Sequence, residues 1–203
     1  MPGPKAPEEA RREQIMSAAY RVALHTGVAG VTLRAVAAEA GLSHGLVVFY
    51  FKGKDQLIAA LLDRVLATTA MLHMSEDVAR IPHAAERLGA LLRQELVRLA
   101  GDPRGLRLFF EYWALGVRQV AVRRKIGAAL ERYRAAFGAI AEEMLPADAA
   151  PGPDITPETL AAVAVSLING FAVQAMIDPD RFDTRAYLAA VQGLIDRLAP
   201  APA

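Results

Sequence analysis

The segment from Thr32 to Leu57 constrains the fold more than any other part of the chain. Apolar residues at helical spacing predict a short helix over 33–40, with the Thr32 hydroxyl as its N-terminal cap. Gly41 interrupts that pattern, as a glycine just past a helix end does, and Ser43 caps a second, equally short helix. This spacing predicts a helix-turn-helix, in which the second helix enters the major groove of DNA.

The residues after the turn resemble the signature of a known family. Tyr-Phe-Lys-Gly-Lys-Asp-Gln-Leu occupies 50–57, shortly after Ser43-His44-Gly45, and the whole segment closely resembles the DNA-binding signature of TetR-family transcriptional regulators. The chain departs from the family at Val48 and Phe49, where many members carry a polar or aromatic residue and a histidine. The resemblance therefore implies TetR-like DNA binding without implying a particular operator.

Eight residues of this segment are candidate DNA contacts. Lys54 opens the next predicted helix, where an ammonium group and free backbone N–H groups together suit a phosphate. His44 and Gly45 open the second helix of the pair, close to where base edges are read, although a solvated histidine would fit the pattern as well. Tyr50 resembles the family tyrosine that reaches a phosphate, and its ring also suits a small core. The full set is Thr32, Arg34, Ser43, His44, Gly45, Tyr50, Lys52 and Lys54.

The composition predicts an all-α protein. Apolar residues make up 54% of the chain, strong helix formers dominate, and no run of residues alternates as a strand does. We expect about nine helices, with a loop over 146–157. Eight of them lie near 8–26, 33–40, 43–50, 83–99, 104–118, 121–144, 158–178 and 185–199, and the fourth starts near Lys54, carries apolar residues through Val65 and ends before Pro82. We expect residues 1–53 to form the DNA-binding domain behind a disordered arm (1–7), and 54–203 to bind an effector and dimerise.

Charge divides unevenly between these two parts. Residues 1–54 hold seven basic and four acidic side chains, whereas the whole chain carries only +1, so the remainder is net acidic. A mildly basic head suits a protein with a few placed phosphate contacts, although ordinary surface charge would give the same count.

The helix that follows Pro157 is uncharged from Leu160 to Ile177, which is long enough to consider a membrane span. Its small residues, its polar Asn169 and its acidic flanks argue against that interpretation. A helix that is apolar all round is equally suited to burial within a protein. Together with the apolar stripe over 185–199, which includes Leu194, it predicts a four-helix interface between two copies, the way TetR-like proteins dimerise.

Aromatic residues of the larger domain predict an effector pocket. Leu106, Phe110, Trp113 and Val117 share one helical stripe, and Asn169-Gly170-Phe171 resembles the choline-sensing, BetI-like branch of the family. That resemblance implies a cation, held by aromatic faces and by Glu111, whereas the residues themselves favour a neutral apolar ligand. The candidate effector residues are Phe109, Phe110, Trp113, Tyr133, Phe137, Asn169 and Phe171.

Enzyme, metal and cofactor interpretations find no support in the sequence. There is no cysteine, the four histidines are never at metal-ligand spacing, and neither a G-x-S-x-G nor a G-x-G-x-x-G motif is present. We expect a cytoplasmic, homodimeric repressor that binds double-stranded operator DNA and is released by a small molecule. Two alternatives remain, a helical ligand-binding or scaffold dimer without DNA binding and an all-α transferase.

Overall fold

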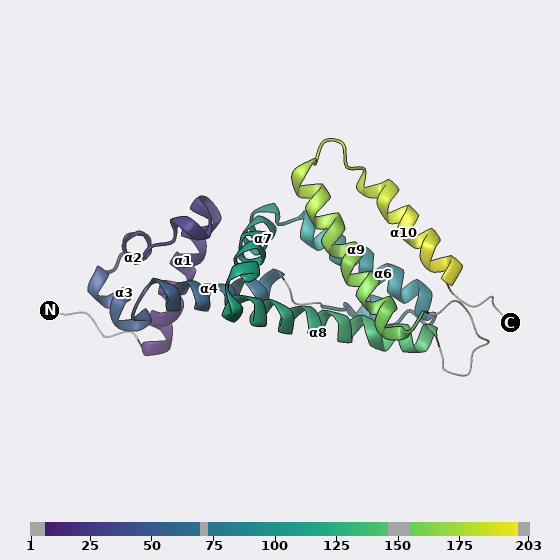
Figure 1. Ribbon diagram of the computed structural model, residues 1–203, viewed down its shortest axis with the longest axis horizontal. Coiled ribbons are helices and arrows are strands. Elements are labelled where there is room, and N and C mark those ends of the chain that lie inside the picture. Colours follow the sequence, from purple (N-terminus) through teal and green to yellow (C-terminus); the bar gives the residue numbers. More distant parts are fainter. Residues whose placement is uncertain (1–6, 70–72, 146–154, 199–203) are drawn as a thin grey trace. The chain divides into compact units, whose positions relative to one another are not determined.

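A computed structural model describes residues 7–69, 73–145 and 155–198 of the chain (Figure 1). Over these residues the secondary structure consists of helices alone, which confirms the predicted all-α fold. The chain divides into two compact units, one formed by residues 1–69 with 104–126 and the other by 70–103 with 127–203.

The first unit holds the helix-turn-helix. It contains α1 (Glu8–Gly30), α2 (Leu33–Ala40), α3 (His44–Phe51), α4 (Lys54–Thr69), α7 (Pro103–Arg118) and the first turns of α8 (Val120–Met144). Buried apolar side chains from each of the first four helices form one core, among them Ile15, Val36, Val47 and Leu61. Tyr112 of α7 is fully buried. Its hydroxyl donates to the Ile58 carbonyl of α4 at 2.9 Å, and this hydrogen bond links the two helices.

The second unit is a helical bundle. It contains α5 (Glu76–Ala79), α6 (Ala84–Ala100), the rest of α8, α9 (Pro157–Ile177) and α10 (Thr184–Leu198). Both α9 and α10 pack on α6. The buried leucines of α6 are Leu88, Leu91, Leu92, Leu96 and Leu99. Gly89 permits the close approach of α10, because a Cβ there would lie 2.1 Å from the Gln192 Oε1 atom.

Two details of the helix prediction were wrong. The described residues contain ten helices, where the sequence predicted about nine. The sequence missed α5, because this helix has only four residues and is too short to show an apolar period. The first helix does break at Gly27, where φ is +72°, but one more turn continues to Gly30. Most of the expected loop over 146–157 and of the expected arm over 1–7 lies outside the described residues.

Helix α9 is the one helix in the described part of the chain that is long and apolar enough to cross a membrane. It packs on α6, and its buried residues include Ile168 and Phe171. It contacts α10 at Tyr187, whose hydroxyl donates to the Leu167 carbonyl at 2.8 Å. The Phe171 ring lies 5.4 Å from that of Phe182 and 5.6 Å from that of Tyr187. The core helix of a soluble protein has the same length and composition, so this helix is weak evidence for a membrane span.

Candidate nucleic-acid interface and effector site

Hydroxyl caps and a left-handed glycine build the helix-turn-helix. Thr32 Oγ1 accepts from the Ala35 N–H at 3.1 Å at the start of α2, and Ser43 Oγ accepts from the Leu46 N–H at 3.3 Å at the start of α3. Between them Gly41 has φ +66°, a conformation that glycine adopts without the steric cost of a Cβ. Each capping hydroxyl accepts within the protein and keeps its own hydrogen as a donor.

The first unit contains all eight candidate DNA contacts. Seven of them are exposed, and Tyr50 is half-buried. His44 and Gly45 lie in the first turn of α3. Apart from the chain neighbours of Gly45 and the backbone of its own helix, no protein atom lies within 4 Å of the position that a Gly45 Cβ would occupy. The start of the recognition helix is therefore bare enough for a close approach to another molecule.

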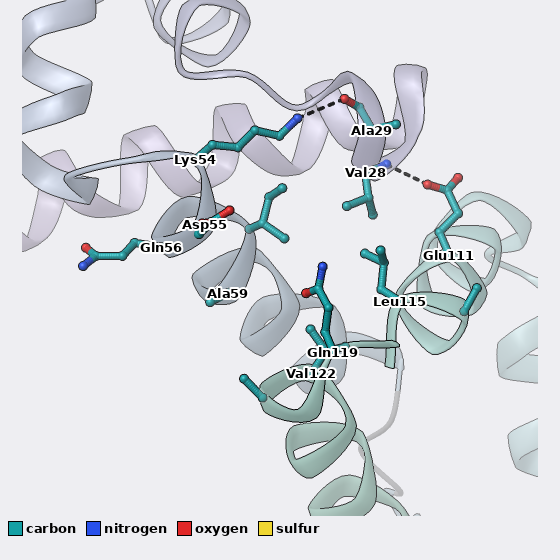
Figure 2. A pocket seen from close by; sticks show the side chains of 13 residues that line it. Val28, Ala29, Lys54, Asp55, Gln56, Ala59, Glu111, Leu115, Gln119 and Val122 are labelled. Atoms are coloured by element: carbon teal, nitrogen blue, oxygen red, sulfur yellow. Dashed lines mark hydrogen bonds between the residues drawn. The ribbon is translucent and has the colours of Figure 1, made fainter. Parts of the chain in front are cut away.

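Lys54 has a contact that the sequence did not reveal. Its ammonium group donates to the Ala29 carbonyl at 3.3 Å, across the start of α4 (Figure 2). An ammonium group has three N–H donors, so this hydrogen bond leaves two for a phosphate.

Phe49 is an exposed aromatic side chain on α3 that sequence reasoning did not include among the contacts. Its side chain is 73% exposed, and its ring packs edge-on against Tyr50 at 5.4 Å. The spacing of Gly45 and Phe49, one helical turn apart, was the available signal, because residues four apart share a helix face.

The candidate effector residues fall into two groups. Phe109, Phe110 and Trp113 lie on α7 in the first unit, with ring centroids 5.6–6.0 Å apart. The second unit holds the other four, Tyr133, Phe137, Asn169 and Phe171. Phe171 and Phe137 are fully buried, and Asn169 is half-buried, so burial does not force a partner on its amide. That the two groups line one cavity stays a prediction.

The stripe that the sequence predicts along α7 is only partly buried. Leu106 is buried, Phe110 and Trp113 are half-buried, and Val117 is 70% exposed. The buried face also carries Leu108, Phe109, Tyr112 and Gly116.

A buried carboxylate escaped the sequence reasoning. The Glu95 side chain is fully buried, receives 2.8 Å hydrogen bonds from Arg98 Nη2 and the Tyr133 hydroxyl, and is thereby paired with a cation. Burial raises the pKa of Tyr133, and Glu95 raises it further, so the phenol stays protonated and donates. The i, i+3 spacing of Glu95 and Arg98 was visible in the sequence, but Tyr133 lies on another helix.

A cleft of about 850 Å³ opens in the first unit (Figure 2). It lies between the last turn of α1, the start of α4, α7 and the first residues of α8. Glu111, which the family resemblance offers as a partner for a cation, is part of its lining. Its Oε2 atom accepts from the Val28 N–H at 2.6 Å.

Comparison with known proteins decides the family. A model of BetI-type transcriptional repressor C-terminal domains matches residues 84–200, and the TetR-family model of bacterial regulatory proteins matches residues 15–61. The chain belongs to the TetR family. It is a ligand-responsive, DNA-binding transcriptional repressor, as the helix-turn-helix signature predicted, and its C-terminal part is of the BetI type.

Individual relatives agree with this assignment. An uncharacterised helix-turn-helix regulator of Xanthobacter autotrophicus is 33% identical over 184 residues, which cover 87% of this chain and 85% of the relative. The regulator BetI of Paraburkholderia phymatum is 25% identical over 94% of this chain and 93% of its own length. The crystal structure of the multidrug-binding protein EbrR with ethidium has a TM-score of 0.67 at 27% identity, covering 94% of this chain and 99% of that one.

Proposed function

We propose that this TetR-family member contacts operator DNA through Thr32, Arg34, Ser43, His44, Gly45, Tyr50, Lys52 and Lys54. The observation that carries the proposal is the exposed first turn of α3, which is held by the Ser43 cap and presents His44 and Gly45. Phosphate contacts from capping hydroxyls and Lys54 would set its position, and the side chains of α3 would read the bases. In this arrangement residues 1–53 are the DNA-binding domain and 54–203 the regulatory domain of a cytoplasmic protein.

The test is selection of bound DNA from a random pool with the full chain. We expect an enriched motif with two-fold symmetry, because a dimer presents two recognition helices to two half-sites. Enrichment of a motif without symmetry would contradict the dimeric arrangement, and a lack of any enrichment would support the scaffold alternative.

Dimerisation through α9 and α10 is the second part of the proposal. Four large apolar side chains on these helices are exposed in the single chain, namely Val163, Val173, Ile177 and Leu194, between 41% and 73%. Exposed apolar residues that gather on two neighbouring helices are typical of an interaction surface. A second copy packed there would complete a four-helix interface.

Release by a small molecule is the third part. Six of the seven candidate pocket residues are aromatic, and Glu95, the carboxylate that accepts from Tyr133, is already paired with Arg98. A pocket of this kind favours a neutral apolar effector. Two comparisons favour the alternative, a cationic effector. They are the complex of EbrR with ethidium, which is an organic cation, and the match to BetI-type C-terminal domains.

A further inference from the structure

The cleft of the first unit has an apolar floor and charged edges. Val28, Ile58, Leu115 and Val122, with several alanines, supply most of its lining, and three charged side chains, Lys54, Asp55 and Glu111, stand around it (Figure 2). The Lys54 ammonium is directed to the Ala29 carbonyl at one end. The lining of the cleft therefore has two carboxylates, Asp55 and Glu111, and one ammonium, which already donates a hydrogen bond to the Ala29 carbonyl.

Glu111 is held in this cleft by a specific fit. A Cβ at Gly27 would lie 2.7 Å from its Oε2 atom, so a glycine at that position makes room for the carboxylate. The nearest cation, Arg107, is 3.9 Å from Oε1, which is too far for a hydrogen bond, and both side chains are partly exposed. Such a pair neutralises the carboxylate weakly.

We propose that this cleft binds an organic cation with an apolar body, as a regulatory site separate from the effector pocket proposed above. The ligand's cation would lie at Glu111, with Asp55 on the facing helix, and its apolar body would cover the floor formed by Val28 and Leu115. Attraction to a carboxylate is stronger beside apolar surface than in water, and the floor adds the gain from removing apolar area from water.

Helix geometry separates this site from the aromatic one. Phe109 and Trp113 each stand two positions before a cleft residue of α7, Glu111 and Leu115 respectively. Two positions amount to about 200° around a helix, so the rings of Phe109 and Trp113 lie on the side of α7 away from Glu111 and Leu115. Phe110, four positions before the cleft residue Ala114, lies nearer to the side of the cleft. A ligand bound at Glu111 and Leu115 therefore leaves Phe109 and Trp113 uncovered.

An occupant of the cleft would act on DNA binding at short range. It would lie against Val28 and Ala29, which lead through Val31 into the Thr32 cap of α2, and against Lys54 at the start of α4. Competition for the Glu111 carboxylate would weaken its hydrogen bond with the Val28 N–H. This consequence rests on the DNA contacts proposed above, whereas binding of the cation does not.

Three probes with one apolar body test the ligand class by isothermal titration calorimetry without DNA. They are 4-phenylbutylammonium, 4-phenylbutanol and 4-phenylbutyrate. We expect the ammonium to bind about tenfold more tightly than the alcohol, and the carboxylate to bind most weakly. Equal affinity for all three would overturn the proposal of a cation site.

Matched variants locate the site. Glu111→Gln keeps an oxygen that accepts from the Val28 N–H but removes the charge, so the ammonium should bind it only as tightly as the alcohol. Glu131→Gln removes an exposed carboxylate of α8 and should bind all three probes as the wild type does. Ala114→Trp, at an exposed position in the lining, should fill the cleft and block binding while circular dichroism stays unchanged. Undiminished ammonium binding by Glu111→Gln would show that the site lies elsewhere.

The consequence for DNA is measured separately. Saturating ammonium probe should lower the affinity of the wild type for its selected DNA and leave that of Glu111→Gln unchanged. A wild type that binds the probe but selects no DNA would refute the proposed DNA contacts and leave the cation site standing. A wild type that selects DNA but binds no probe would refute the cation site and leave the proposed DNA contacts standing.

Phe49 carries a second, independent inference. We infer that this side chain reads the methyl group of a thymine, given that α3 enters the major groove as proposed. It is 73% exposed, one helical turn beyond Gly45 on the bare side of α3, and has neither donor nor acceptor for a base edge. The C5-methyl group of thymine is the apolar feature of the major groove, and phenylalanine is among the residues that contact it.

Single thymine-to-uracil replacements in the selected DNA test this inference. Each removes one methyl group and leaves every hydrogen bond of the base pair. At one position per half-site the wild type should lose about fourfold in affinity, the value for one buried methyl group. Phe49→Ala should bind thymine and uracil DNA equally while retaining its salt dependence. A wild type indifferent to every replacement would overturn the inference.

Discussion

At the scale of single residues, charge and hydrogen-bonding groups on the helix-turn-helix make separable contributions. Replacing Lys54 with alanine removes one ammonium from the start of α4. We expect weaker binding to selected and random DNA alike, with the salt slope of log K reduced by about one unit, because one fewer counterion is released. Arg132→Ala is the control, since Arg132 is exposed on α8 in the other unit. An unchanged slope in Lys54→Ala would remove this phosphate contact.

His44 belongs to the same scale but to another class of contact. If its ring donates to a base edge, His44→Ala should change the sequence preference and leave the salt slope nearly unaltered. Repeating the random-pool selection with this variant measures that change. A motif identical to that of the wild type would show that His44 is merely solvated.

At the scale of elements, the break in α1 depends on a glycine that satisfies two requirements together. Gly27 has φ +72°, and a Cβ there would meet the Glu111 carboxylate at 2.7 Å. Gly27→Ala should therefore lower the free energy of unfolding by about 1–3 kcal/mol in urea denaturation. Gly127→Ala lies in a regular helix with open space around it and should be neutral or stabilising by up to about 1 kcal/mol. Equal effects of the two changes would contradict this account of the break.

At the scale of the whole molecule, the proposed function requires two copies. The wild type should sediment as a dimer at micromolar concentration, and Leu194→Asp should dissociate it, because an unpaired carboxylate in the seam costs several kcal/mol. Val97→Asp is the matched control, since Val97 is 64% exposed on α6, outside the proposed seam. Operator affinity should fall with dissociation. A monomeric wild type would refute dimerisation through α9 and α10.

The chemical class of the effector is a further prediction at the scale of the whole molecule. A thermal-shift screen should compare quaternary amines with neutral aromatic and fatty compounds in the wild type, Trp113→Ala and Glu111→Gln. We expect neutral compounds to stabilise the wild type and to lose that effect in Trp113→Ala, because Trp113 belongs to the α7 aromatic group. Stabilisation by amines that depends on Trp113 and not on Glu111 would assign a cation to the aromatic pocket instead.

The sequence by itself determined the features that depend on neighbours along the chain. Thr32, Gly41 and Ser43 predict the helix-turn-helix. Helix capping and the left-handed backbone conformation of a glycine are local effects that depend on only a few neighbouring residues. The all-α fold followed from the apolar period of the helices in the same way. The family followed from the residue pattern over 32–57.

Only the tertiary structure decided which distant residues meet. Glu111 and Val28 are separated by 83 positions, and Tyr133 and Glu95 by 38, so no local pattern reveals either hydrogen bond. The cleft exists because α1, α4, α7 and α8 meet around it. Phe49 is exposed because α3 packs on α2 and α4 and buries Val47 and Phe51 instead. The local sequence pattern predicts which side chains share one face of a helix. The packing of that helix against others decides which of them are buried, paired or left open to a ligand.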